Sequence, residues 1–318
     1  METLIGAGGW AYFQVPSIDS LQAYSSAFNF VEVNSTFYEI PSLELVDSWR
    51  RRVVPNFEFA VRCHKDITHK YQMEPNEATL GTFRIMKCIC EALRSRYLVL
   101  ETPPTLNFNI EKLESVREIF ANVDLKGLRI VWEIRRKRGK PIPSSLIALM
   151  HDYNMIHCVD FSKEDILLES DAVYTRIFGK GENNIYQFTD EELVEIDRKI
   201  TKKNPETAVL SFHNVRMYKD AARYKIHKLT GSFPPATASE GLLSLREVLV
   251  EDTNFPITRQ ELIKHQGWKI VDLTGKKKIR AASLLEKLPD RIFRNVNEIL
   301  DCLSETNPIH NSDNVEAK

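Results

Sequence analysis

The sequence is poor in cysteine and lacks any long apolar run. Its five cysteines are scattered, with none in C-x-x-C spacing. A small, odd number of cysteines is typical of reduced thiols rather than of a disulfide framework. No segment approaches the roughly 20 apolar residues that a membrane-spanning helix needs. The first residues, Met1-Glu2-Thr3-Leu4, lack the basic and apolar regions of a signal peptide. We therefore expect a cytoplasmic protein that makes no membrane contacts.

The net charge is close to zero, and the common catalytic motifs are absent from the sequence. The formal net charge is −1, so attraction to nucleic acid would have to come from a local patch. There is no G-x-S-x-G for a serine triad and no H-x-H or H-E-x-x-H for zinc. The stretch Gly6-Ala7-Gly8-Gly9 lacks the full G-x-G-x-x-G, and no helix start follows it. No nucleotide cofactor is expected.

What is present is an alternation of short apolar runs with helical patterns. Eight runs predict strands, at residues 4–6, 30–33, 57–61, 97–100, 129–132, 156–159, 172–175 and 208–212. Helices are predicted at residues 18–28, 43–52, 77–94, 110–122, 144–153 and 190–200, whereas residues 163–170 give no clear helical pattern. Such alternation indicates a parallel sheet covered by helices. Eight units favour an eight-stranded parallel β/α barrel of the TIM type over an open doubly wound sheet.

The pattern changes after about residue 235. We expect a barrel over residues 1–235, a small, basic, mostly helical appendage over 236–303, and a disordered tail over 304–318. Thr258 with Glu261 and Asn295 with Glu298 resemble capping boxes. Residues 255–301 contain ten Lys or Arg against six acids, with the densest cluster at Lys276–Lys278 and Arg280. A solvated turn is the plainer interpretation of this cluster, and a nucleic-acid patch is the alternative.

Several motifs resemble the YecE-like family, the domain of unknown function 72. They begin with Gly6-x-x-Gly9-Trp10-x-Tyr12 and Val31-Glu32-Val33-Asn34-Ser35-Thr36-Phe37-Tyr38. Further matches are Trp49, Phe57-x-Phe59-Ala60-Val61, Ile67-Thr68-His69, Pro103-Pro104, Glu133-x-Arg135, Asp160, Tyr174-x-Arg176 and Phe212-x-Asn214. The chain looks like an archaeal-type member over residues 3–230, with the appendage outside the family pattern. The resemblance implies a barrel and supplies no reaction.

The sequence departs from that family pattern at five positions. Arg62 stands where a lysine is usual, and Glu101 where a glutamine is usual. Arg136 and Phe178 replace histidines, and His213 replaces an asparagine. Losing two histidines puts in doubt a shared acid–base role at positions 136 and 178.

Polar residues follow each predicted strand, and in barrels such residues gather at the carboxyl ends of the strands. The predicted catalytic residues are Glu32, Glu133, Asp160, His69 and Tyr38; the predicted substrate-binding residues are Asn34, Arg62, Arg135, Arg176 and Asn214. His64, Glu101 and His213 complete the set, and Trp10 and Asn34 could equally be packing and turn residues. The alternative is a buried ion-pair network that closes the barrel.

Three chemistries compete for this set of residues. The first is chemistry on a phosphate ester (a sugar phosphate, a nucleotide or a nucleic acid). The arginines bind the phosphate, Glu133 or Asp160 acts as general base, and His69 acts as general acid. The second is glycoside hydrolysis by a carboxylate pair that includes Glu101. The third is hydrolysis assisted by a divalent metal on Glu133, Asp160 and His213, which the lack of H-x-H and H-E-x-x-H spacing disfavours.

The non-enzymatic alternative is a nucleic-acid-binding module. It would use the arginines at the strand ends, the basic appendage, and the aromatic residues Trp10, Phe37 and Tyr38. The expected ligand is thus an anionic small molecule or a nucleic acid, and no oligomeric state follows from the sequence.

Overall fold

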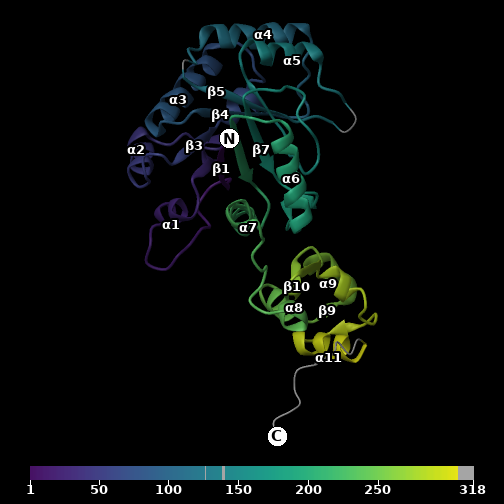
Figure 1. The fold of residues 1–318 in the computed structure, drawn as a ribbon. Coiled ribbons are helices and arrows are strands. Elements are labelled where there is room, and N and C mark those ends of the chain that lie inside the picture. The colour runs from purple at the N-terminus through teal and green to yellow at the C-terminus, as the bar shows by residue number, and fades with distance from the viewer. Residues whose placement is uncertain (126, 138–139, 307–318) are drawn as a thin grey trace. The chain divides into compact units, whose positions relative to one another are not determined.

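The computed structural model describes residues 1–125, 127–137 and 140–306. These residues form two compact units. The first contains Met1–Lys180 and Val194–Lys225, and the second contains Gly181–Leu193 and the described residues from Ile226 onward. Figure 1 follows the chain from its purple amino terminus to its yellow end. Among the described residues, no helix is long and apolar enough to cross a membrane.

The first unit is built around eight parallel strands. They are β1 (Glu2–Ala7), β2 (Phe30–Val33), β3 (Glu58–Arg62), β4 (Tyr97–Thr102), β5 (Arg129–Ile134), β6 (Ile156–Cys158), β7 (Ala172–Ile177) and β8 (Thr207–Phe212). Their order in the sheet is β6-β5-β4-β3-β2-β1-β8-β7. A single parallel bridge between Val159 and Thr175 joins the two ends of this order. The predicted β/α barrel is confirmed, with β6 and β7 forming its weakest seam.

Helices follow most of the strands, as the sequence predicts. They are α1 (Ser20–Ala27), α2 (Leu43–Arg51), α3 (Glu77–Leu93), α4 (Ile110–Asn122), α5 (Ser144–Asp152), α6 (Asp190–Lys202) and α7 (Met217–Thr230). Three short turns of helix, η1 (Ser35–Phe37), η2 (Asp66–Lys70) and η3 (Glu182–Asn184), lie in the connections after β2, β3 and β7. Side chains of Asp19, Ser42, Asn76 and Asn109 cap the first four helices by accepting backbone amides. No helix forms between β6 and β7, and α7 is not among the predicted helices.

The barrel interior is a packed apolar core. Its buried cluster includes Leu4, Phe30, Ala60, Tyr97, Val99, Val131, Cys158, Tyr174 and Val209. Alternate residues of a strand face the same side, so the next inward positions toward the carboxyl ends are the polar ones. These are Glu32, Arg62, Glu101, Glu133, Arg176 and Ser211, each two residues beyond a member of the apolar cluster. The strand period therefore places one layer of charge directly on top of the core.

The second unit is small and mostly helical, as expected, with short antiparallel pairs that the sequence did not predict. It contains α8 (Gly241–Val250), β9 (Ile257–Thr258), α9 (Arg259–Gln266), β10 (Ile270–Thr274), β11 (Lys277–Arg280), α10 (Ala282–Leu285), β12 (Ile292–Phe293) and α11 (Val296–Thr306). β10 pairs with β11, and β9 with β12. Of the predicted tail, residues 304–306 end α11, and residues 307–318 lie outside the described residues.

Local signals in the second unit are partly confirmed. The capping box of Thr258 and Glu261 forms at the start of α9. At α11 the Glu298 amide donates to Asn295 Oδ1 at 3.0 Å, but the Glu298 carboxylate accepts from the Arg294 amide instead of that of Asn295. A separate apolar core, with Leu245, Leu249, Leu262, Leu285 and Phe293 among its members, holds these helices together.

Candidate active site

Arg176, the last inward residue of β7, is the centre of the charged layer. Its side chain is 2% exposed. Its guanidinium contacts Glu32 Oε1 at 3.1 Å, Glu101 Oε2 at 2.8 Å and Glu133 Oε2. Three carboxylates from three different strands thus share one cation, and its terminal nitrogens are all in use.

Glu101, at the end of β4, contacts all three predicted site arginines. Arg62 approaches Oε2 at 2.5 Å, and Arg135 approaches Oε1 at 2.9 Å. Arg135 also donates through Nε to Glu133 at 2.9 Å. The layer therefore contains three glutamates and three arginines in mutual contact, and their formal charges cancel. This is the pairing that the ion-pair-network interpretation requires.

Asn34 and His213 close the contacts into a ring. Arg62 Nη1 lies 3.5 Å from Asn34 Oδ1, and Asn34 Nδ2 lies 3.4 Å from His213 Nδ1. His213 Nε2 lies 3.5 Å from Glu32 Oε2, which leads back to Arg176. Gly8 makes room for the ring, because a Cβ there would lie 2.4 Å from His213 Nδ1.

Burial and ion pairing shift the pKa values of the site residues in opposite directions. Burial alone would raise the pKa of Glu32, but Arg176 and then His213 outweigh it, and the pKa falls well below its ordinary value. For Glu133, Arg176 and Arg135 likewise outweigh burial and lower the pKa. Burial lowers the pKa of His213 by more than Glu32 raises it. Near neutral pH the site therefore holds ionised carboxylates beside a neutral imidazole.

Asp160, a predicted catalytic residue after β6, has its carboxylate occupied by the loops. Oδ1 accepts from the amide and hydroxyl of Ser162 at 2.9 and 2.6 Å. Oδ2 accepts from the amides of Phe178 and Gly179 at 3.0 and 3.2 Å. The structure thus shows Asp160 holding the loop after β7 in place.

Phe178, two residues beyond Arg176, is a site residue that the sequence reasoning noted only as a departure from the family pattern. Its ring stacks on His213, with centroids 4.9 Å apart and planes at 29°. The cations of Arg176, Lys163 and Arg135 lie 5.3, 5.7 and 5.9 Å from its centroid. The period-two pattern that picks out Arg176 also points to Phe178, while no local signal points to Lys163.

His69 and Tyr38 come from the turns after β3 and β2. His69 Nδ1 lies 2.8 Å from Thr68 Oγ1, and the His69 ring meets the edge of Phe37 at 5.2 Å. Burial lowers its pKa, and Arg62 and Arg135 lower it further against the opposing effect of Glu101. Phe37 in turn lies under Arg62, 3.8 Å from ring centroid to guanidinium carbon. Tyr38 is 63% exposed.

Three other candidate residues contact different parts of the unit. Asn214 donates to Asp220 on α7 at 2.7 Å. Trp10 packs edge-on against Trp49 of α2, with centroids 5.3 Å apart. His64 accepts the Asp66 amide through Nδ1 at 3.3 Å and so supports the start of η2.

The proposed metal ligands are not grouped. Glu133 contacts arginines, Asp160 contacts backbone amides, and His213 contacts Glu32 and Ser211. Within the described ranges, no three His, Cys, Asp or Glu side chains are arranged to hold a metal ion.

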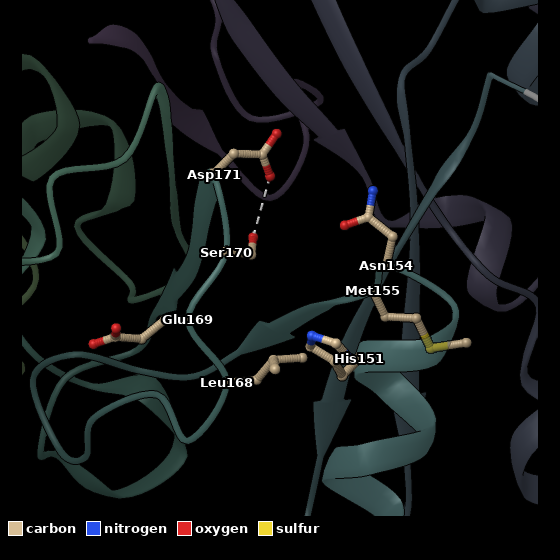
Figure 2. A pocket seen from close by; sticks show the side chains of 7 residues that line it. All are labelled: His151, Asn154, Met155, Leu168, Glu169, Ser170 and Asp171. Carbon is tan, nitrogen blue, oxygen red and sulfur yellow. Dashed lines mark hydrogen bonds between the residues drawn. The ribbon is translucent and has the colours of Figure 1, made fainter.

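A surface pocket lies at the opposite ends of β6 and β7, before the strands begin (Figure 2). It is lined by His151, Asn154, Met155, Leu168, Glu169, Ser170 and Asp171. Arg129 Nη1 forms an ion pair with Asp171 Oδ1 at 2.6 Å, and Arg129 Nη2 donates to Asn154 Oδ1 at 3.1 Å. Because barrel enzymes work at the carboxyl ends of their strands, we assign this pocket no part in the site.

A comparison with protein-family models shows the family of this chain. The model of the family described as "Protein of unknown function DUF72" matches residues 4–237. A solved DUF72 family protein of Enterococcus faecalis is 16% identical, with a TM-score of 0.57 over 73% of this chain and 98% of its own. One from Thermotoga maritima is 17% identical, with a TM-score of 0.57 over 73% and 100%. At these identities the likeness shows the fold alone. No curated protein matches the chain.

Proposed function

This chain belongs to the DUF72, or YecE-like, family, and from that premise we propose that it is an enzyme with its active site at the carboxyl ends of the barrel strands. We propose further that its substrate is a small molecule with an anionic, phosphate-bearing group. The family description assigns no reaction, so the proposal depends on the side chains of the charged layer and on the loops around it.

The observation that carries the proposal is the charge-balanced network of Glu32, Glu101 and Glu133 with Arg62, Arg135 and Arg176, in which every side chain except that of Arg135 is largely buried. Ion pairs of this kind lose solvation on burial, and apolar residues of similar volume would stabilise the barrel as well or better. Six ionisable groups above an apolar core, at the end of a barrel where chemistry occurs, therefore favour a functional role.

Arg135 and Lys163 are the best candidates to bind the anionic group. Their side chains are 42% and 46% exposed, and both lie within 6 Å of the Phe178 ring centroid. Arg176 is buried, and both of its terminal nitrogens contact carboxylates, so we assign it to holding the glutamates rather than the substrate. Arg62 is almost as buried and supports the same glutamate, Glu101.

Proton transfer is best assigned to a histidine. Carboxylates with lowered pKa values, such as Glu32 and Glu133, are weak general bases. His69 is neutral near pH 7 and partly exposed, and its Nε2 makes no hydrogen bond within the described residues, so it can accept a proton. Glu133, with a side chain 14% exposed, can accept hydrogen bonds from a bound molecule, whereas Glu32 is closed off from solvent.

Glycoside hydrolysis and nucleic-acid binding have less support. Glycoside hydrolysis needs one protonated carboxylic acid, and the arginines favour the ionised form of Glu133. A nucleic-acid surface would need exposed cations and aromatic rings, but Lys278 and Arg280 are paired with acidic residues and Trp10 is packed against Trp49.

The proposal is tested with sugar phosphates, nucleoside monophosphates and inorganic phosphate, each compared with its unphosphorylated counterpart where one exists. Calorimetry should detect a phosphorylated compound whose affinity falls about 10–100-fold in Arg135→Ala, the loss of one hydrogen-bonded charge contact. Turnover of that compound should fall in His69→Gln while its binding persists.

Lys137→Ala is the matched control, because Lys137 is exposed on the same loop and its side chain makes no polar contact among the described residues. It should leave affinity unchanged. Equal affinity in wild type and Arg135→Ala, or preference for unphosphorylated compounds, would refute the anionic substrate.

A further inference from the structure

We propose that the second unit is an internal clamp: the surface of its β10–β11 hairpin binds the chain's own segment Gly181–Leu193 and thereby positions Phe178. This segment connects β7 to α6 and begins three residues after Phe178. The proposal rests on the proposed function only in that Phe178 borders the site.

Gln187 is held from both sides by the hairpin. The Ile270 amide of β10 donates to Gln187 Oε1 at 3.0 Å, and Arg280 of β11 donates to the Gln187 carbonyl at 3.2 Å. Gln187 is buried, at 4% exposure. A buried amide side chain that satisfies a strand-edge amide is costly to remove, because its loss leaves the Ile270 amide without a partner.

Charge and aromatic contacts extend the same surface. Lys278 pairs with Asp190 at 2.7 Å, and Arg280 pairs with Glu192 at 3.2 Å. The Arg280 guanidinium also lies 4.7 Å from the centroid of Tyr186. The basic cluster of the appendage is therefore complementary to an acidic and aromatic stretch of the same chain. Two of its four cations, Lys278 and Arg280, are used for this purpose.

The clamp is close enough in the chain to act on Phe178. On one side, Asp160 accepts the amides of Phe178 and Gly179. On the other, Gly181 lies so close to Ile185 that a Cβ would approach the Ile185 carbonyl oxygen to 2.0 Å, so the segment turns sharply there. Three residues span at most about 10 Å, so release of Gly181–Leu193 would free one of the two ends that restrain the Phe178 backbone. The amide hydrogen bonds to Asp160 and the stacking of the ring on His213 would then hold Phe178 without the clamp.

The test is amide hydrogen exchange in the full-length chain. In Arg280→Ala, exchange at Phe178 and Gly179 should accelerate about tenfold or more, as should exchange in residues 186–192, while β4 stays protected. The His213 ring, freed of its stacking partner, should titrate closer to an ordinary histidine by NMR. Arg280→Lys, which keeps the charge opposite Glu192, should restore part of the protection.

Lys277→Ala is the matched control, since Lys277 lies on the same strand with an exposed side chain that makes no polar contact in the described part of the chain. Lys277→Ala should leave amide exchange at Phe178, at Gly179 and in residues 186–192 as in the wild type. If Arg280→Ala unfolds the second unit, Gln187→Ala, which removes one hydrogen bond from the clamp, takes its place. Unchanged exchange at Phe178 with faster exchange at 186–192 would overturn the clamp's role in positioning. Phosphate binding is a separate measurement, so failure of either proposal is recognisable.

Discussion

Gly8 shows how closely single residues are fitted around the charged ring. A Cβ at this position would lie 2.4 Å from His213 Nδ1 and 2.5 Å from Asn34 Nδ2. We expect Gly8→Ala to displace both side chains and to destabilise the protein by about 1–3 kcal/mol, the usual cost of overpacking. Urea unfolding measures the free energy, and the NMR signals of His213 report the displacement.

Gly81→Ala is the control, for which we expect a change in unfolding free energy of the opposite sign. Gly81 lies inside α3, and a Cβ there would meet nothing within 4 Å. Gly81→Ala should therefore stabilise the protein by about 0.5–1 kcal/mol through helix propensity. Destabilisation by both substitutions alike would show that steric conflict at the ring is not the cause.

Within the described part of the barrel, the connection from β6 to β7 contains no helix and depends on side-chain contacts instead. The Leu167 amide donates to His157 Nδ1 at 3.0 Å, and His157 is buried on β6. Burial, and next the charge of Arg136, lower the pKa of His157 from 6.5 to about 4. The hydrogen bond needs the neutral ring, because a protonated Nδ1 cannot accept.

This shift predicts a loss of stability in acid. As pH falls below 6.5, the unfolded chain binds a proton at His157 that the folded chain refuses until about pH 4, so the free energy of unfolding falls. The loss from this group is on the order of 3 kcal/mol. His157→Asn keeps an acceptor for Leu167 without titrating, so it should narrow the difference in unfolding free energy between about pH 7 and pH 4.

The exposed His151 is the comparison for this prediction. His151→Asn should leave the difference between the two pH values as in the wild type. An equally steep acid loss in His157→Asn would mean that the carboxylates of the charged layer, and not this histidine, cause it.

At the scale of the barrel, the seam between β6 and β7 should open first. It is held by the bridge from Val159 to Thr175, with Thr175 Oγ1 donating to the Val159 carbonyl at 2.8 Å. By contrast, β4 and β5 pair over six residues. Amide exchange should be faster at the seam than between β4 and β5, and Thr175→Val should increase the difference. Slower exchange at the seam than between β4 and β5 would contradict this expectation.

Much of the fold follows from local patterns. Near-continuous apolar strands and capped amphipathic helices identify all eight barrel strands and six of its helices, because both signals are contained within one segment. The strands β9 to β12 were missed, since two- to five-residue strands carry little pattern. The seventh helix, α7, was missed as well.

Local sequence patterns are enough to predict which charged residues lie together, because strand period and barrel topology bring Glu32, Arg62, Glu101, Glu133 and Arg176 to one layer. The partner of each side chain, by contrast, is visible only in the folded structure. Every arginine of the layer pairs with a glutamate, and Asp160 accepts hydrogen bonds from three backbone amides and one hydroxyl. Two of the four cations in the basic appendage cluster pair with residues of Gly181–Leu193. The physical reason is that a residue's face on a strand depends on its neighbours in the chain, whereas its ion-pair partner depends on distances between segments remote in sequence.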